Sequence, residues 1–342
     1  MHRVAPRRKI AEAAESGDLA PGTLFCPFAS GLNPAAELAQ TASVAWALRH
    51  GLVDANAVSA FASAKLARLN ARVFSGAPLE RLQLAADWTT FFCCIDDVME
   101  SDRRSMFARS ALLDALVGSF RTGKRQIDDR LADALADLSV RMRAVATPQW
   151  MDAFTARLEE LFVGYVWESM HRDNALWPSV SAYLKMRATT IGLQPQFLLG
   201  ELAEGIAIDA EHKAHPLLQR MMLATSNCVG WANDLFTWEK EREAGEFHNL
   251  VRLLADERKI SIDEAVLRVV ALHNDEVRNF LALEEQLPSF GDGDDDVRAF
   301  VAMLKSWMRG HLDWAQETGR YRPRGSRRAQ GTAATRRVRP SR

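Results

Sequence analysis

The sequence predicts an all-α fold built as a single domain. Apolar residues recur with helical spacing from Ala35 to about residue 321, and no stretch alternates convincingly as a β-strand. Proline and glycine interrupt this pattern at intervals typical of helix lengths. No repeat of about 20 to 50 residues and no long linker divides residues 35–321.

The composition is that of an ordinary soluble enzyme. The chain has 342 residues, of which 48% are apolar and 25% are charged, so its length is ample to bury a core. No window approaches about 18 uncharged apolar residues, and the basic start at residues 1–9 is not followed by an apolar segment. We therefore expect a cytoplasmic protein with no membrane association.

The net charge of −1 is unevenly distributed. Seven arginines and no acidic residue follow Pro323, so the rest of the chain carries −8. We expect residues 324–342 to be a disordered basic tail, which alone does not predict nucleic-acid binding. Residues 1–24 are expected to be disordered or irregular because proline and glycine are frequent there. The four cysteines match neither a zinc site nor a disulfide framework.

Turn and cap signals divide residues 35–321 into helices. Pro34 and Pro78 suit first helical turns, and Gly245 stops a long helix. One helix starts at Ser179 or Ser181 and contains Gly192 and Pro195, so it must bend or break there. The other expected helices are about 35–50, 54–74, 78–100, 105–121, 126–145, 148–173, 216–244, 261–286 and 293–318.

An apolar run ends in three carboxylates at the end of the predicted helix 78–100. Asp96 and Glu100 lie one turn apart on one helix face, and Asp97 lies about 100° round from Asp96. Carboxylate oxygens suit Mg²⁺, which proteins usually share with substrate phosphates. Taken alone, this cluster fits a solvated helix end equally well.

A second set of oxygen donors lies on the predicted helix 216–244. Asn233, Thr237 and Glu241 have the spacing i, i+4, i+8, which places an amide, a hydroxyl and a carboxylate along one face. Asn and Thr compete for backbone hydrogen bonds, so a solvated helix face rarely carries both. These oxygens are also ligands of the kind that Mg²⁺ takes.

Together the two sets resemble the metal-binding motifs of class I terpene synthases. Asp96 to Glu100 is similar to Asp-Asp-x-x-(Asp/Glu), and Asn233 to Glu241 is similar to Asn-Asp-x-x-(Ser/Thr)-x-x-x-Glu, 137 positions further on (96 to 233). The resemblance covers about residues 25–323. It implies the class I terpenoid synthase fold, a helical bundle with a central active-site cavity.

The resemblance also implies metal ligands. Asp96, with Asp97 or Glu100 in support, would hold two Mg²⁺ ions, and the triad on the second helix would hold a third. The acidic motif ends in Glu100 where many relatives have aspartate, so Glu100 could form hydrogen bonds without touching metal. The third ion would be bound by Asn233, Thr237 and Glu241.

Diphosphate-binding residues follow from the same resemblance. Arg187 lies 46 residues before Asn233, where bacterial members place a diphosphate-sensing arginine, and Arg320-Tyr321 resembles the pair that grips this group on closure. Lys240 would bind it too. Thr190 would be the linker after the sensor, and the Ile191 carbonyl the effector near the ionising carbon, although many relatives have Asp-Gly or Thr-Ser at these two positions.

Ionising an allylic diphosphate leaves a carbocation that must not meet water. Aromatic faces stabilise such a cation without acting as nucleophiles. Phe91 and Phe92 precede the carboxylates by one turn and are candidates for the pocket wall. Ordinary core packing is an equal alternative for each aromatic. The further candidates are Phe197, Trp231, Trp307 and Trp314.

The expected function is therefore Mg²⁺-dependent cyclisation of a linear isoprenyl diphosphate, in the commonest case farnesyl diphosphate, to a sesquiterpene. Alternatives are cyclases acting on geranyl or geranylgeranyl diphosphate, a prenyl diphosphate synthase, and a non-catalytic helical binding protein. Glu168 to His171 has the Glu-x-x-His spacing of di-iron bundles, but no second copy occurs. Nucleic acid and membranes are not expected partners, and a homodimer is left open.

Overall fold

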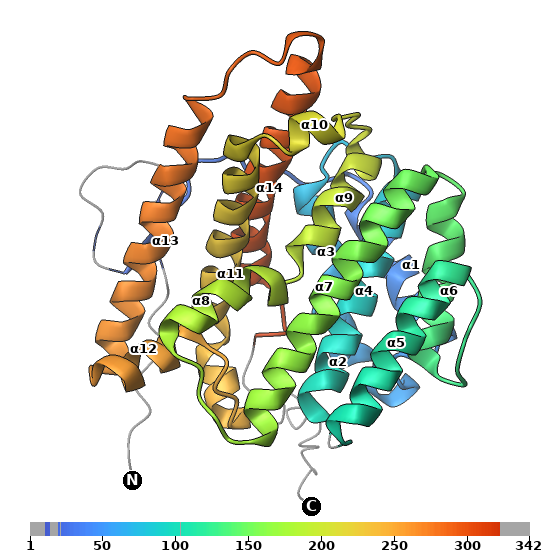
Figure 1. Ribbon diagram of the computed structural model, residues 1–342, viewed down its shortest axis with the longest axis horizontal. Helices are drawn as coiled ribbons and strands as arrows, with labels where there is room; N and C mark the ends of the chain where they lie inside the picture. Colours follow the sequence, from blue (N-terminus) through green and yellow to red (C-terminus); the bar gives the residue numbers. More distant parts are fainter. Residues whose placement is uncertain (1–10, 14–19, 21, 103, 322–342) are drawn as a thin grey trace, which may run out of the picture.

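A computed structural model describes residues 11–13, 20, 22–102 and 104–321 of the chain (Figure 1). It confirms an α-helical array. Figure 1 shows α12 and α13 at one side and α5 and α6 at the other, with α4, α7 and α11 between them. The helices of the first half are α1 (Ala36–Arg49), η1 (Ala55–Ala57), α2 (Val58–Ala62), α3 (Leu66–Val73), α4 (Leu79–Ser101), α5 (Met106–Thr122), α6 (Arg130–Arg143) and α7 (Pro148–Asp173).

The second half contains the predicted bend and the long helix. Gly192, at a φ of +74°, separates α8 from α9, and Gly245, at a φ of +75°, ends α11. The elements are α8 (Val180–Thr190), α9 (Leu193–Glu204), α10 (Ala210–Lys213), α11 (Pro216–Ala244), α12 (Leu250–Arg258), α13 (Ile262–Glu284), η2 (Gly291–Gly293) and α14 (Asp294–Glu317).

Side-chain caps fix several helix starts where the sequence carries short polar residues. Asp129 accepts a hydrogen bond from the Leu131 amide at 2.7 Å, and Ser179 accepts one from the Ala182 amide at 3.2 Å. Each cap satisfies an amide that has no partner within its own helix. Similar caps start α5, α7, α12 and α13.

Three expectations need correction. Residues 54–74 form η1, α2 and α3 rather than one helix, because Lys65 adopts a left-handed φ of +50°. The short helices α10 and α12 were not expected. Residues 1–24 are not wholly irregular, since β1 (Ala11–Ala13) pairs in parallel with β2 (Thr23–Phe25), with Ala11 opposite Thr23. The predicted basic tail lies outside the described residues, and the boundary at residue 25 stays a prediction.

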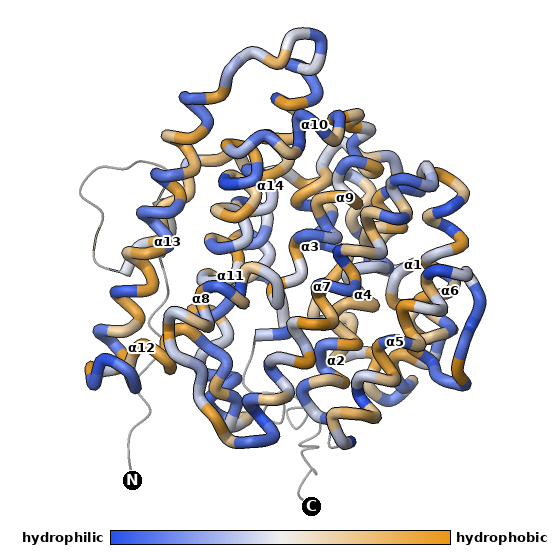
Figure 2. The backbone as a smooth tube through the Cα atoms, in the orientation of Figure 1, coloured by the Kyte–Doolittle hydropathy of each residue, from blue (hydrophilic) through white to orange (hydrophobic). Residues whose placement is uncertain are grey.

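The core consists of two apolar clusters. One lies mainly among α3, α11, α13 and α14, and the other among α4, α5, α6 and α7. Figure 2 shows hydrophilic and hydrophobic residues alternating along the outer helix α13, as expected for a helix with one buried face. Within the described residues, no helix is both long and apolar enough to cross a membrane. The two clusters leave a cavity between α4, α9, α11 and α14.

Candidate active site

The carboxylates of α4 lie at one end of this cavity. Thr89, Phe92, Cys93 and Asp96 all line it, as the i, i+3, i+4, i+7 spacing along one helix face requires. Burial raises the pKa of Asp96 to about 6, although the nearby Arg320 charge lowers it. Burial and the Asp96 charge raise the pKa of Glu100 to about 7.

Arg320 covers these carboxylates. Its guanidinium donates two hydrogen bonds of 3.0 Å to the two oxygens of Asp97 and a longer one of 3.2 Å to Asp96. The planar guanidinium matches the two oxygens of one carboxylate, so this contact is well aligned. Arg320 therefore offsets part of the negative charge at the acidic end of α4.

The second set of donors lies on α11, as predicted. Thr237 is buried and donates to the Asn233 carbonyl oxygen at 2.8 Å. Glu241 accepts a hydrogen bond of 2.8 Å from the Asn249 side chain, and burial together with the Asp234 charge raises its pKa to about 7. Asn233 lines the same cavity as Asp96, so the structure brings one member of each motif to a shared space.

This donor set fits a hard divalent cation. Asp96, Glu100 and Glu241 have raised pKa values because each is buried close to another carboxylate, and a nearby cation favours the charged form. Carboxylate, amide and hydroxyl oxygens are ligands that Mg²⁺ accepts. Among the described residues, no three acidic, histidine or cysteine side chains already converge as a metal site.

Arg187 reaches α11 from α8. It donates to Asp234 at 3.0 Å and to the Asn233 side-chain oxygen at 2.7 Å. Asp234 is buried and also accepts from the Tyr183 hydroxyl and the Leu250 amide, so it joins α11 to α8 and to the start of α12. Gly230 makes room for this crossing, since a Cβ there would lie 3.2 Å from Arg187 Cγ.

Lys240 of α11 contributes positive charge near the carboxylates of α4. Its positive charge lowers the pKa of both Asp96 and Glu100, although burial of these two carboxyl groups is the larger effect and raises it. The Lys240 charge therefore acts on the acidic end of α4.

The bend between α8 and α9 forms one wall of the cavity. Thr190, Ile191 and Gly192 all line it. The hydroxyl of Thr190 is buried without a hydrogen-bond partner among the described residues. A Cβ at position 192 would lie 2.4 Å from the Phe92 ring, so the glycine permits both the turn and the close approach of this ring.

Aromatic residues line the apolar part of the cavity, but not all the predicted ones. Phe92, Trp307 and Trp314 are at its wall. The prediction that Phe91 lines the wall is wrong. Phe91 lies about 100° round α4 from Phe92 and packs against Trp88 in the α4–α7 core. Phe197 and Trp231 are likewise buried in the other core cluster and are not among the residues at the wall.

The cavity has a volume of about 100 Å³, well below the roughly 300 to 1,000 Å³ of pockets that hold small ligands. Its apolar walls would therefore have to separate to admit a ligand of that size. The same cavity is lined at its polar end by Asp96, Arg187, Asn233, Arg320 and Tyr321.

Hydrogen bonds to the region between α2 and α3 fix the segment that carries Arg320 and Tyr321. Thr318 donates to the Ala64 carbonyl at 2.7 Å, and the Gly319 amide donates to the Ser63 carbonyl at 2.7 Å. The Trp314 indole donates to the Lys65 carbonyl at 2.8 Å. The break between α2 and α3, which the sequence pattern missed, thus supplies the carbonyl groups that hold the C-terminal segment.

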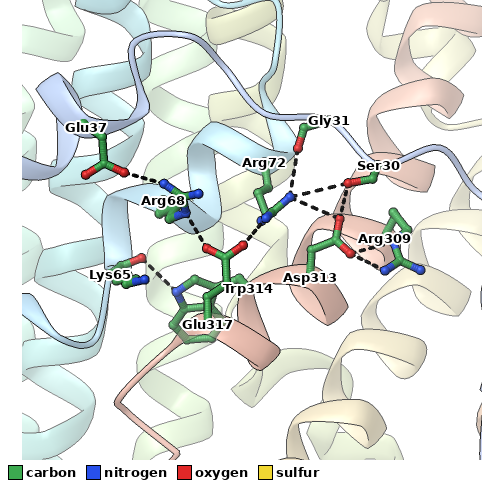
Figure 3. A network of polar contacts seen from close by, with 10 residues as sticks. All are labelled: Ser30, Gly31, Glu37, Lys65, Arg68, Arg72, Arg309, Asp313, Trp314 and Glu317. Carbon is green, nitrogen blue, oxygen red and sulfur yellow. Dashed lines mark hydrogen bonds and ion pairs between the residues drawn. The ribbon is translucent and has the colours of Figure 1, made fainter. Parts of the chain in front are cut away.

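A charged network supports this attachment (Figure 3). Arg68 and Arg72 of α3 both pair with Glu317 of α14, and Arg72 also lies 3.4 Å from Asp313. Figure 3 shows these two arginines side by side opposite the acidic residues. The network fixes the end of α14 directly before the residues that cover the carboxylates.

Several residues at the site were not predicted. Thr89, Gln196 and His311 line the cavity, and the negative charge of Glu168 on α7 acts on Asp96. The spacing of Thr89, seven residues before Asp96, is the one sequence signal that could have indicated its place. His311 is 3.1 Å from the Tyr321 hydroxyl, and burial lowers its pKa to about 3.

Comparison with known proteins agrees with this geometry. Residues 87–279 match the model of "Terpene synthase family 2, C-terminal metal binding". The chain is 29% identical to a germacrene A synthase of Nostoc punctiforme, covering 89% of this chain and 95% of that one. It is also 29% identical to a (+)-T-muurolol synthase of Roseiflexus castenholzii, covering 88% and 93%.

Solved structures share the fold. An α-eudesmol synthase superposes with a TM-score of 0.77 at 20% identity, covering 86% of this chain and 98% of that one. A single-residue variant of a cucumene synthase gives a TM-score of 0.75 at 24% identity, covering 87% and 99%. With more than half of its length matched by the family model, the chain belongs to the terpene synthase family and has the all-α class I terpenoid synthase fold.

Proposed function

We propose that this chain ionises farnesyl diphosphate and cyclises the resulting cation to a sesquiterpene, releasing diphosphate. The observation that carries the proposal is the shared cavity, which has Asp96, Asn233, Arg187 and Arg320 at one end and aromatic walls at the other. Two similar proteins, from Streptosporangium roseum and Roseiflexus castenholzii, are named as cyclising (2E,6E)-farnesyl diphosphate. Their similarity over most of the chain supports this substrate.

The proposed metal ligands come from α4 and α11. Asp96, supported by Asp97 or Glu100, would hold two Mg²⁺ ions, and Asn233, Thr237 and Glu241 would hold a third. When bound, these ions supply positive charge that stabilises the diphosphate as it leaves. The raised pKa values of Asp96, Glu100 and Glu241 support this assignment, because burial disfavours the charged carboxylates and a bound cation would favour them.

Diphosphate binding would release two contacts seen in the structure. Arg320 is held by Asp97 and Asp96, and Arg187 is held in part by Asn233. Once cations neutralise the carboxylates, both guanidinium groups can donate to diphosphate oxygens, for which their planar donors are suited. Lys240 and the Tyr321 hydroxyl would complete the binding of this group.

The isoprenyl chain would extend from the polar end between the aromatic walls. Phe92, Trp307 and Trp314 line this part of the cavity, where aromatic rings would stabilise a cation and exclude water. Thr190 would link the sensor Arg187 to the bend, and the Ile191 carbonyl would face the ionising carbon. Widening of the cavity beyond its 100 Å³ is part of the proposal.

A substrate panel tests the proposal. The purified protein is incubated with Mg²⁺ and geranyl, farnesyl or geranylgeranyl diphosphate, and a solvent extract is analysed by gas chromatography. We expect C15 products from farnesyl diphosphate at the highest yield. Cyclic products from the C10 or C20 substrate alone would overturn the choice of farnesyl diphosphate, and no diphosphate release from any of the three would overturn the enzyme assignment.

A further inference from the structure

A hydrogen-bonded polar pair lies in the cavity away from the carboxylates. Gln196 of α9 donates through its side-chain amide to the Thr89 hydroxyl of α4 at 2.7 Å. Both residues line the cavity, and they are only 3% and 2% exposed. Thr89 lies two helical turns before Asp96 on the same face, about 10 Å along the axis, so the pair faces the hydrocarbon end of the proposed substrate.

One polar atom of this pair lacks a partner. The side-chain oxygen of Gln196 is buried and accepts no hydrogen bond from the part of the chain that the structure describes. Turning the amide over would leave its NH₂ group in that position instead, so one end of the amide is unsatisfied in either orientation. Buried polar atoms of this kind nearly always bind protein or ordered water, which indicates a missing polar ligand.

The cavity that this pair lines is larger than one water molecule. A volume of about 100 Å³ exceeds the roughly 30 Å³ that one water occupies in the liquid, and a buried water needs two or more polar partners. The Gln196 oxygen can accept a hydrogen bond from a water, and the Thr89 hydroxyl, which accepts one from Gln196, still has its own proton to donate. The surrounding Phe92, Leu193 and Trp307 offer apolar surface.

We propose that Gln196 and Thr89 hold a water molecule that captures the final carbocation, so that the main product is a sesquiterpene alcohol. The inference rests on the proposed cyclase function. A lone pair of the water oxygen forms the new C–O bond to the cationic carbon. The resulting oxonium loses one proton, which ends on the released diphosphate, the base that the reaction itself supplies.

A purely structural role for the pair makes a different prediction. If Gln196 only joined α9 to α4, its replacement would lower stability or total turnover and leave the proportions of the products unchanged. If it holds the water, its replacement changes the ratio of alcohol to hydrocarbon while diphosphate release continues. The product ratio and the origin of the hydroxyl oxygen therefore separate the two roles.

The experiment uses the full chain, Mg²⁺ and farnesyl diphosphate in ¹⁸O-labelled water, with products analysed by gas chromatography and mass spectrometry. We expect the major product to be a C15 alcohol that carries one ¹⁸O atom. Diphosphate release accompanied only by hydrocarbons, or by an unlabelled alcohol, would overturn this inference and leave the proposed function intact. Absence of diphosphate release would overturn both.

Variants then assign the water to the pair. Gln196→Met, of similar volume but without the amide, should lower the alcohol-to-hydrocarbon ratio at least about tenfold, equivalent to about 1.4 kcal/mol between competing steps. Gln196→Glu keeps an oxygen at this place and should retain the alcohol. Thr89→Val and its control Thr89→Ser give an independent pair should Gln196→Met fold poorly. An unchanged ratio in folded Gln196→Met or Thr89→Val would overturn the assignment.

Discussion

Asn233 donates a hydrogen bond from its side-chain nitrogen to the Tyr321 hydroxyl at 2.7 Å, joining α11 to the C-terminal segment. Its side-chain oxygen accepts from Arg187, also at 2.7 Å. Both ends of the amide are thus engaged by residues proposed to bind diphosphate. A cation that takes the Asn233 oxygen would displace Arg187 toward the substrate, which couples metal binding to diphosphate binding.

The proposed ligands should be needed for turnover and dispensable for folding. Asp96→Ala or Asn233→Ala removes an oxygen donor at the polar end of the cavity, and we expect turnover to fall at least about 1,000-fold because charge on the leaving group is no longer neutralised. Diphosphate release gives the rate, and circular dichroism the helical content. Asn279→Ala, which removes an amide from α13, is the control. Wild-type product yield in either ligand variant would contradict the assigned roles.

The contact between Gly192 and Phe92 should matter beyond the turn itself. Gly192→Ala places a Cβ 2.4 Å from the Phe92 ring at a φ of +74°, so it should cost more than the roughly 1 to 2 kcal/mol of left-handed strain. Gly51→Ala is the matched control, since its φ is +63° and no atom lies within 4 Å of the added Cβ. Urea unfolding of both variants measures the difference, and equal losses would argue against the Phe92 contact.

Glu317 should hold the C-terminal segment in place. Glu317→Gln weakens its ion pairs with Arg68 and Arg72, and we expect a loss of about 1 to 2 kcal/mol in the free energy of unfolding. Turnover should fall by more than the loss of folded protein accounts for, because Arg320 follows three residues later. Asp295→Asn breaks an exposed ion pair with Arg298 and should cost less than about 0.5 kcal/mol. Unchanged turnover in folded Glu317→Gln would separate this network from the site.

His273 should make the protein less stable in mild acid. Burial lowers the pKa of His273 to about 4, below the value of about 6.5 in an unfolded chain. The contribution of neutral His273 to the free energy of unfolding is therefore complete above pH 6.5. It falls by up to about 3 kcal/mol as the pH drops toward 4, since the unfolded chain binds a proton that the folded one does not. Urea unfolding at pH 7.5 and 5 should show a smaller difference for His273→Gln than for the wild type. Equal differences would contradict this role.

Most of the helices and the spacing of both motifs were predictable from sequence because they depend on local spacing. The i, i+4, i+8 pattern of Asn233, Thr237 and Glu241 needs only a helix to align the three side chains. The bend at Gly192 was equally local. Phe92 as a candidate wall residue followed from its place one turn before the carboxylates.

The predictions that failed concern features that depend on contacts between distant segments. The left-handed Lys65 is stabilised by Trp314, 249 residues away, which no local pattern records. Phe91 and Phe92 are neighbouring residues of the same type. Only the orientation of α4 in the fold determines that Phe91 lies in the core and Phe92 at the cavity wall. Gln196 pairs with Thr89 across 107 positions, so neither residue shows a polar role in the sequence alone.

Metal-dependent diphosphate release tests the central claim most directly. The protein is freed of divalent ions with a chelator, and release of diphosphate from farnesyl diphosphate is followed before and after Mg²⁺ is added. We predict no release without the ion and saturable release with it, accompanied by C15 products. Equal release with and without Mg²⁺, or none in its presence from the folded protein, would contradict the account.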